Sequence, residues 1–122
     1  MKLSTGVDIL EIDRLKDVIE RHGERFLKRV YTPRELAQVG NNTASLAARF
    51  AAKEAVSKAL GTGLGIVSFQ HVEILRDEAR APLLYLHGEA RQRADLHGLQ
   101  TWSLSLSHSD EYAIAFVVAS GG

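Results

Sequence analysis

Three charged residues in apolar surroundings, Asp8, Glu54 and Lys58, are the first residues of this chain that suggest chemistry. At about 100° per residue, Glu54 and Lys58 stand one turn apart on a helical ridge that begins at Phe50. Alanines and larger apolar residues surround this ridge, so we expect Glu54 to be partly buried. A buried carboxylate is costly unless a cation or hydrogen-bond donors meet it.

Asp8 lies in a less favourable place, between apolar neighbours in the strand pattern at residues 6–12. Aspartate is depleted in strands, and in such a position it needs a specific partner. A strand carboxylate and a helix carboxylate together are typical ligands of a hard divalent cation such as Mg²⁺, which adds water and phosphate oxygens. The alternative is structural: Glu54 and Lys58 form an exposed i,i+4 ion pair that adds about 0.2–0.5 kcal/mol to helix stability.

Hydrophobic periods and capping signals divide the chain into the elements that must position these residues. We expect strands at residues 3–12, 66–76, 83–87, 102–107 and 112–119. We expect helices at residues 14–22, 44–60 and 89–97, and a short helix from Pro33. The last two strands form a hairpin, and few strands alternate with helices one by one. The chain is therefore expected to be α+β, a mainly antiparallel sheet packed against one long helix, in a single domain over residues 1–122.

Several helix ends carry explicit signals. Asp13 is placed to cap the first helix, which Gly23 ends, and Thr32 with Glu35 forms a capping box around Pro33. The segment 41–43 caps the long helix. The glycine cluster at residues 61–65 follows that helix, so it indicates a C-cap and a turn; a phosphate-binding loop would precede a helix.

Composition excludes several classes of protein. The chain has no cysteine, which excludes disulfides and thiolate metal sites and fits a cytoplasmic location. No segment approaches the roughly 20 apolar residues of a membrane span, and charges from Asp8 onward argue against a signal peptide. The formal net charge of zero argues against bulk nucleic-acid binding.

Charge is unevenly distributed along the chain. Residues 14–34 contain seven basic and three acidic residues, an excess of +4, whereas residues 1–13 and 35–122 are each net −2. A basic segment on a neutral protein steers an acidic partner, and Arg14, Arg21 and Arg25 are the residues we expect at its docking surface. The alternative is an ordinary solvated helix face.

Five segments in order, covering nearly the whole chain, resemble the holo-acyl-carrier-protein synthases of the 4′-phosphopantetheinyl transferase superfamily. They are GVDILEIDRL (6–15), RFLKRVYTPREL (25–36), RFAAKEAVSKALGTGLG (49–65), APLLYLHGEA (81–90) and SLSHSDEYAIA (105–115). The third segment is highly specific. The chain departs from the family pattern at Ser4, Ala48 and Arg80, each where glycine is common, and in a shorter loop near residues 40–43. None of these departures touches the expected metal ligands.

The resemblance implies an enzyme that transfers the 4′-phosphopantetheine group from coenzyme A to a serine of apo acyl carrier protein and releases adenosine 3′,5′-bisphosphate. It implies Mg²⁺, or Mn²⁺, held by Asp8 and Glu54, with Lys58 beside the same phosphates. Glu54 or a metal-bound water would take the serine proton. The resemblance also implies a homotrimer with sites between subunits, and a role in fatty acid biosynthesis. Candidates for the nucleotide phosphates are Arg49, Lys53 and His108.

His108 lies in a turn between two serines, with Asp110 nearby. A Ser–His–Asp triad is a poor explanation, since triad partners converge from separated positions. A turn histidine bonded to local backbone is the alternative to the phosphate role. For the whole protein, the alternatives are a non-catalytic module that binds carrier protein or nucleotide, and a metal-dependent phosphohydrolase.

Overall fold

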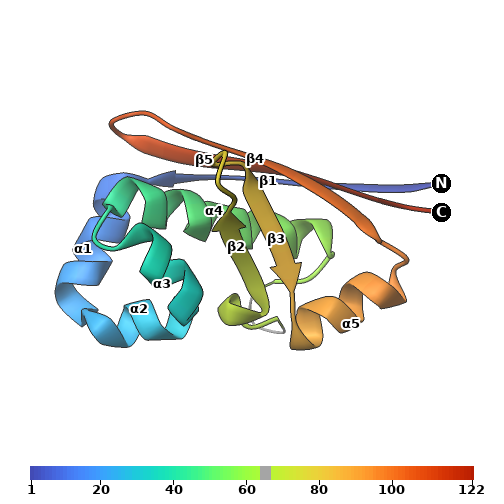
Figure 1. Cartoon of the computed structure of the whole chain (residues 1–122), viewed down its shortest axis with the longest axis horizontal. Coiled ribbons are helices and arrows are strands. Elements are labelled where there is room, and N and C mark those ends of the chain that lie inside the picture. The colour runs from blue at the N-terminus through green and yellow to red at the C-terminus, as the bar shows by residue number, and fades with distance from the viewer. Residues whose placement is uncertain (64–66) are drawn as a thin grey trace.

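The protein is described here by a computed structural model, which covers residues 1–63 and 67–122 (Figure 1). The elements, in chain order, are β1 (Lys2–Glu11), α1 (Ile12–His22), α2 (Glu24–Val30), α3 (Pro33–Val39), α4 (Thr43–Ala59), the 3₁₀ turn η1 (Phe69–His71), β2 (Val72–Arg76), β3 (Pro82–Leu86), α5 (Gly88–Leu96), β4 (Thr101–His108) and β5 (Tyr112–Gly121). None of the described helices is long and apolar enough to cross a membrane.

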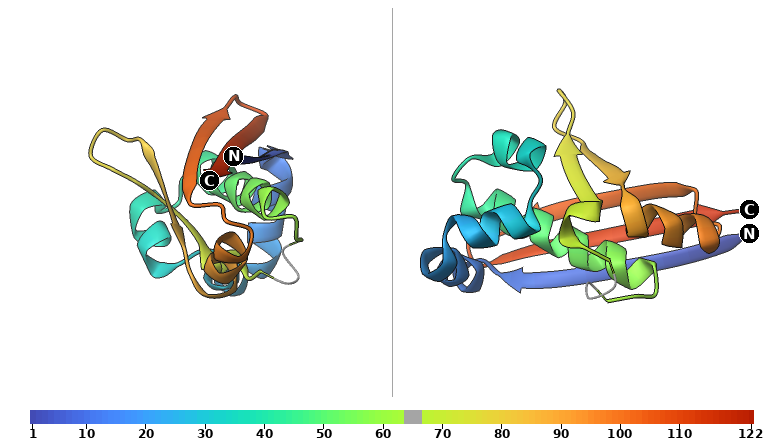
Figure 2. Two further views of the ribbon diagram at one scale, coloured as in Figure 1. Left: turned by 90° about the vertical axis from the view of Figure 1, so that its right-hand side faces the viewer. Right: turned by 90° about the horizontal axis from the view of Figure 1, so that it is seen from below.

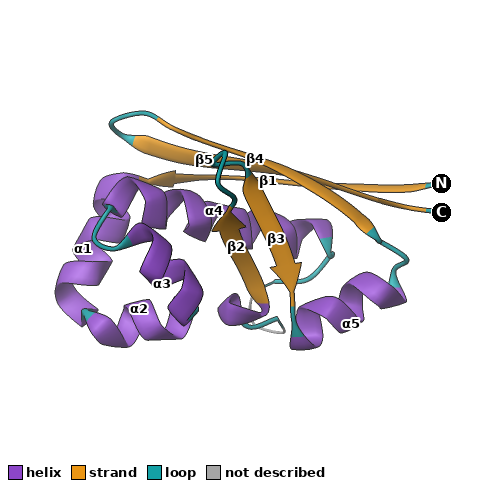
Figure 3. Cartoon of the chain, viewed as in Figure 1, coloured by secondary structure: helices purple, strands orange, loops and turns teal. Residues whose placement is uncertain are grey.

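Two antiparallel sheets make up the β structure. The larger has the order β1–β5–β4, and the smaller is the β2–β3 hairpin. Figure 3 shows α4 running along the larger sheet, with β2 and β3 beside the same helix and α1, α2 and α3 grouped at one end. The expected α+β fold, with antiparallel strands packed on one long helix, is confirmed.

Helix α4 is buried on nearly every side because most of its residues are small. Ala47, Ala51 and Ala55 are fully buried, and they belong to the two hydrophobic clusters that this helix joins. Small side chains let other elements approach the helix backbone closely. The alanine-rich sequence therefore places α4 at the centre of the molecule.

The crossing of β1 over α4 is a backbone contact. A Cβ atom at Gly6 would lie 1.8 Å from the carbonyl oxygen of Ala55, so only glycine fits there. Two residues earlier, the Ser4 hydroxyl donates to the Ala59 carbonyl at 2.5 Å. Because side chains alternate along a strand, Asp8 is on the same face of β1 as Gly6 and faces the helix.

Most of the helix caps that the sequence predicted are present in the structure. Thr32 and Glu35 form the expected capping box, and the Asn42 side chain caps α4 by accepting from Ser45 N. Gly23 ends α1 with a φ of 54°. The role given to Asp13 is wrong: α1 begins at Ile12, so Asp13 lies in its first turn.

The structure differs from the sequence expectations at two further places. Helix α2 was not expected, since Gly23 indicated an end and the seven-residue helix that follows is too short for a clear period. The strand expected at residues 66–76 is shorter: η1 precedes β2, which begins at Val72. Position 66 and the end of the glycine cluster, positions 64 and 65, lie outside the described residues.

The outer face of the larger sheet, away from α4, carries exposed apolar side chains. Val7 and Ile9 of β1 pair in register with Phe116 and Ile114 of β5, and all four side chains are exposed. Such a row on the surface of a sheet is typical of an interaction surface.

Candidate active site

Strand β1 and helix α4 bring together the three residues that the sequence singled out. Lys58 Nζ lies 3.2 Å from Asp8 Oδ1 and also donates to the Val7 carbonyl at 2.9 Å. Glu54 is one turn before Lys58 on α4, close enough to both residues to feel their charges. We call Asp8, Glu54 and Lys58 the open cluster, because the Asp8 and Lys58 side chains are 20% and 53% exposed.

The open cluster holds two carboxylates against one ammonium group. Partial burial raises the pKa of Glu54 above its ordinary value, and the negative charge of Asp8 raises it further. The Lys58 ammonium lowers it, but not enough to cancel these effects. The cluster therefore has an excess of negative charge that a cation would neutralise.

The donor set fits Mg²⁺. Carboxylate oxygens are hard ligands, and no third acidic, histidine or cysteine side chain joins the two carboxylates within the described part of the chain. Two protein carboxylates with the remaining positions left to water and phosphate oxygens is the usual arrangement for Mg²⁺ at a phosphate-transfer site. Partial exposure leaves room for such ligands.

Lys53 occupies a different environment from the one expected. Its side chain is 0% exposed, and the ammonium group donates to Glu35 Oε1 at 2.8 Å and to the carbonyls of Phe69 and Val72. Burial lowers its pKa, and the Glu35 carboxylate opposes that shift. All three donors are used inside the protein. This position is at odds with the assignment of Lys53 to the nucleotide phosphates.

The Glu35 carboxylate likewise makes its hydrogen bonds inside the protein. Beyond its part in the capping box, its Oε2 accepts from the backbone N–H of Ile74, and its Oε1 meets Lys53. We call Glu35 and Lys53 the closed pair. It ties α3, α4 and β2 together.

Arg49 lies one turn before Lys53 and lines a small cavity. It is 3% exposed, and its guanidinium donates to the Glu35 carbonyl at 3.2 Å and to Gln38 Oε1 at 3.0 Å. The cavity, about 200 Å³, is bounded by Gln38, Val39, Ser45, Arg49, Arg76, Asp77 and Arg80. Sequence reasoning missed Arg76 and Arg80, because nothing local links the β2–β3 turn to α4.

His108 ends β4 and is exposed, and its Nδ1 lies 3.4 Å from the carbonyl of Ser109. This long contact matches the local-backbone alternative, and β5 lies between His108 and the strand that carries Asp8. The structure does not bring His108 into the open cluster of the same chain.

The open cluster and the Arg49 cavity lie on different sides of the molecule. In the right-hand view of Figure 2, β1 runs along one edge of the larger sheet, whereas the β2–β3 turn extends beyond the opposite edge. On α4, Glu54 is five residues after Arg49, about 140° around the helix. One chain thus presents two separate charged sites.

The basic residues expected at a docking surface are exposed. Arg14 and Arg21 lie on α1 and Arg25 is the second residue of α2. None of the three makes an ion pair with a described residue. Helix α1 follows β1 directly, so these arginines belong to the helices that come just after the strand that holds Asp8.

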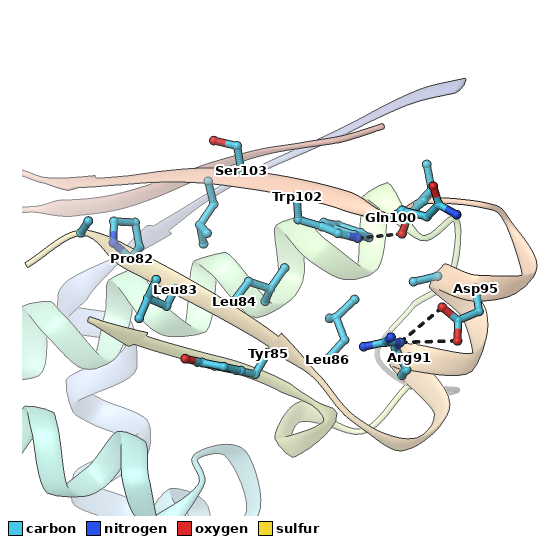
Figure 4. Close-up of a pocket in the computed structure, with 14 residues that line it drawn as sticks. Pro82, Leu83, Leu84, Tyr85, Leu86, Arg91, Asp95, Gln100, Trp102 and Ser103 are labelled. Carbon is cyan, nitrogen blue, oxygen red and sulfur yellow. Dashed lines mark hydrogen bonds and ion pairs between the residues drawn. The ribbon is translucent and has the colours of Figure 1, made fainter. Parts of the chain in front are cut away.

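A second cavity, about 640 Å³, lies apart from these charges. It is bounded by β3, α5 and β4, and its apolar lining includes Leu84, Leu86 and Trp102 (Figure 4). The charged residues in it, Arg91 and Asp95, pair with each other. Nothing in this cavity matches the charge of a phosphorylated ligand.

Comparison with known proteins identifies the family. A model of the 4′-phosphopantetheinyl transferase superfamily matches residues 4–117. The chain belongs to this superfamily. It is 50% identical to the holo-[acyl-carrier-protein] synthase of Herpetosiphon aurantiacus, with 98% of this chain and 99% of that protein covered. It is 51% identical to the synthase of Moorella thermoacetica, with 93% and 90% covered.

A solved structure agrees with these relatives. The crystal structure of the holo-[acyl-carrier-protein] synthase of Helicobacter pylori in complex with coenzyme A superposes with a TM-score of 0.87 at 36% identity, covering 95% of this chain and 99% of that one. The resemblance to holo-acyl-carrier-protein synthases in the sequence is confirmed, and the chain is an enzyme of this family.

Proposed function

We propose that this enzyme transfers the 4′-phosphopantetheine group from coenzyme A to a serine of apo acyl carrier protein. The observation that carries the proposal is the open cluster: two partly buried carboxylates and a lysine, brought together from β1 and α4. The chain is similar to several holo-[acyl-carrier-protein] synthases, and the similar synthase of Helicobacter pylori was solved in complex with coenzyme A. The absence of cysteine fits action in the reducing cytoplasm, in the supply of carrier protein for fatty acid biosynthesis.

In this reaction the serine oxygen forms a bond to the phosphorus that bears the pantetheine arm. The pyrophosphate bond to that phosphorus breaks, and adenosine 3′,5′-bisphosphate leaves. Phosphoryl transfer asks a protein mainly to position the reactants and to neutralise developing charge. Lys58 does the second, since its ammonium group is half exposed beside the carboxylates. The serine proton passes to Glu54 or to a water held at the cluster.

Asp8 and Glu54 would hold the cation, Mg²⁺ or Mn²⁺. When bound there, the metal supplies positive charge to the pyrophosphate oxygens and stabilises the leaving group. Asp8 is positioned for this by the contact of Gly6 with Ala55, and Glu54 by the buried frame of α4.

At the nucleotide end of the substrate, Arg49 contacts the 3′-phosphate and His108 another phosphate oxygen. Arg49 suits this role because it is held rigidly by Gln38 and the Glu35 carbonyl while its cavity opens to solvent. We leave Lys53 out of the phosphate contacts, since its donors are all engaged in the interior.

We propose further that the enzyme is a homotrimer with active sites between subunits. Two features support this. Strand β1, which carries Asp8, runs along one edge of the larger sheet and the β2–β3 turn beside the Arg49 cavity extends beyond the other, an arrangement that fits a substrate bound between two copies of the chain. The exposed apolar row of Val7, Ile9, Ile114 and Phe116 offers the surface for such an assembly. Light scattering of the purified protein measures the mass directly.

The acyl carrier protein docks on α1 and the start of α2 in this proposal. Arg14, Arg21 and Arg25 are exposed and free of intramolecular ion pairs among the described residues, as a surface for an acidic partner requires. Arg14→Glu and Arg21→Glu should raise the KM for carrier protein and leave that for coenzyme A nearly unchanged. If neither reversal changes the carrier kinetics or their salt dependence, docking lies elsewhere.

One assay tests the proposed function. Coenzyme A is incubated with the enzyme and Mg²⁺, with and without apo carrier protein, and release of adenosine 3′,5′-bisphosphate and the mass of the carrier are measured. We expect release only when carrier protein and Mg²⁺ are both present, with one phosphopantetheine added per carrier. Release without carrier would identify a phosphohydrolase, and binding without release a non-catalytic module; either result overturns the proposal.

A further inference from the structure

The cavity beside Arg49 is built from residues that hold one another in place. The Gln38 side chain reaches from α3, and its Oε1 accepts both from Arg49 Nη2 at 3.0 Å and from the backbone N–H of Arg76 at 2.9 Å. Arg76 Nη1 in turn donates to the carbonyl of Arg80 at 2.6 Å. Arg49 and the β2–β3 turn are therefore fixed relative to each other by one amide.

The cavity is strongly positive. Three arginines, Arg49, Arg76 and Arg80, line it against one acidic residue, Asp77. Asp77 Oδ1 is engaged within the turn, where it accepts from the backbone N–H of Ala81 at 2.9 Å. Burial lowers the pKa of Arg49, and although Glu35 opposes the shift, the charges of Arg76 and Arg80 add to it. Like charges held this close favour an anion between them.

Arg80 is the residue whose presence needs an explanation. Its φ is 66°, and it is the single non-glycine residue with positive φ in residues 1–63 and 67–122. Side chains other than glycine rarely adopt this conformation, and backbone strain of this kind concentrates at functional sites. The Arg80 guanidinium has no hydrogen-bond or ion-pair partner among the described residues, so it is available to a ligand.

We propose that Arg80 and Arg76 join Arg49 in a three-arginine subsite for the 3′-phosphate of coenzyme A, and that Arg80 sets the preference of this enzyme for the 3′-phosphorylated nucleotide. This inference rests on the proposed function, which supplies the nucleotide. The cavity volume of about 200 Å³ accommodates a single phosphate group with its hydrogen-bond donors. The charge of the subsite suits the dianionic 3′-phosphate.

The test uses the full chain with Arg80→Gly, which removes the charge and suits the positive φ. The ratio of kcat/KM for coenzyme A to that for dephospho-coenzyme A, which lacks the 3′-phosphate, should fall about tenfold relative to wild type. The melting temperature should hold or rise, since glycine relieves the strained backbone. A residue with a purely structural role would not lower the ratio while the protein became more stable.

Binding measured without carrier protein separates this inference from the proposed function. Isothermal titration calorimetry should show that Arg80→Gly weakens the binding of adenosine 3′,5′-bisphosphate about tenfold more than the binding of adenosine 5′-monophosphate. Arg80→Asn, a neutral residue that also tolerates positive φ, should behave like Arg80→Gly. Arg91→Gln is the charge control, because it removes one exposed positive charge on α5 that does not line the Arg49 cavity.

The outcomes are distinct. The subsite would be overturned if both Arg80 variants kept the wild-type preference for ligands that carry a 3′-phosphate. It would also be overturned if Arg91→Gln reduced this preference as much as the Arg80 variants do. A wild-type enzyme that transfers phosphopantetheine but shows no such dependence refutes only this inference. A wild-type protein that transfers nothing refutes the proposed function, while the calorimetric comparison still decides whether the cavity reads a 3′-phosphate.

Discussion

Helix α4 carries two lysine–carboxylate groups whose environments are opposite. In the closed pair, Lys53 and Glu35 are both 0% exposed, and every polar group has a partner. In the open cluster, Lys58 is half exposed and faces Asp8 while Glu54 keeps a raised pKa. Both groups combine a lysine with carboxylates, and the two lysines are five positions apart on one helix.

The difference lies in how completely the protein satisfies its own charges. A buried ion pair whose hydrogen bonds are all made within the chain fixes the packing of its elements and has nothing left for a ligand. A cluster with two carboxylates and one ammonium group keeps an excess negative charge, which a cation from outside would neutralise. Unsatisfied charge, more than the presence of charge, distinguishes a reactive site from a structural one.

Breaking the closed pair should have the largest effect. Lys53→Met leaves the Glu35 carboxylate buried without its cation, which we expect to lower the free energy of unfolding by about 3–5 kcal/mol. Urea denaturation monitored by circular dichroism measures it. A loss below about 1 kcal/mol would mean that Lys53 is not part of the structural core. Lys53 would then again be a candidate for contacting the nucleotide phosphates.

Substitutions in the open cluster should affect activity more than stability. Asp8→Asn should lower kcat/KM at saturating Mg²⁺ by about 10²-fold or more, because one of two expected metal ligands is lost. The free energy of unfolding should stay the same or increase, since a carboxylate near another carboxylate is removed. Activity within tenfold of wild type would exclude the two-carboxylate site.

Dependence on pH should separate Glu54 from Glu73, the buried carboxylate next to the closed pair. Burial opposes ionisation of Glu73, but hydrogen bonds from Arg34, Thr32 and His87 hold its pKa at about 2, below the ordinary 4.5. Its ionisation therefore stabilises the fold above pH 4.5, and this stabilisation is lost as the pH falls from 4.5 towards 2. Glu73→Gln should flatten the acid-induced loss of stability in that range.

In Mg²⁺-free buffer, ionisation of Glu54 should have the opposite effect on stability from ionisation of Glu73. The folded-state pKa of Glu54 is raised, so the fold loses stability as the pH increases from the ordinary value of 4.5 towards that raised pKa. Glu54→Gln should thus increase the melting temperature at pH 7 by a small amount, and the gain should vanish below about pH 4. Differential scanning calorimetry at both pH values checks this. A decrease at pH 7 would support the structural i,i+4 ion pair with Lys58.

Sequence reasoning was most successful where a signal is local. The Thr32–Glu35 capping box, the stop at Gly23 and the alternation of residues 102–107 each depend on neighbours a few positions away. The open cluster was foreseen because Asp8 is out of place in its own strand. Resemblance to the family then supplied what spacing could not, since nothing local connects Asp8 with α4.

The features that the sequence did not indicate depend on contacts between distant segments. Lys53 looks like Lys58 in the sequence, and only the packing of α3 and β2 over one side of α4 makes it a core residue. Arg76 and Arg80 reach Arg49 through Gln38, a link that no periodic pattern indicates. The division of the strands into two sheets is likewise a property of the assembled chain.

The contact of Gly6 with Ala55 has a consequence for how the enzyme tolerates change. Because the two backbones touch without side chains between them, the strand cannot slide along the helix to absorb a substitution. A single methyl group at Gly6 would push the strand outward and carry the Asp8 carboxylate with it, although neither Asp8 nor Glu54 had changed. Mutational tolerance near this crossing is thus set by the distance between two main chains, and a residue with no side chain at all controls where the Asp8 carboxylate lies.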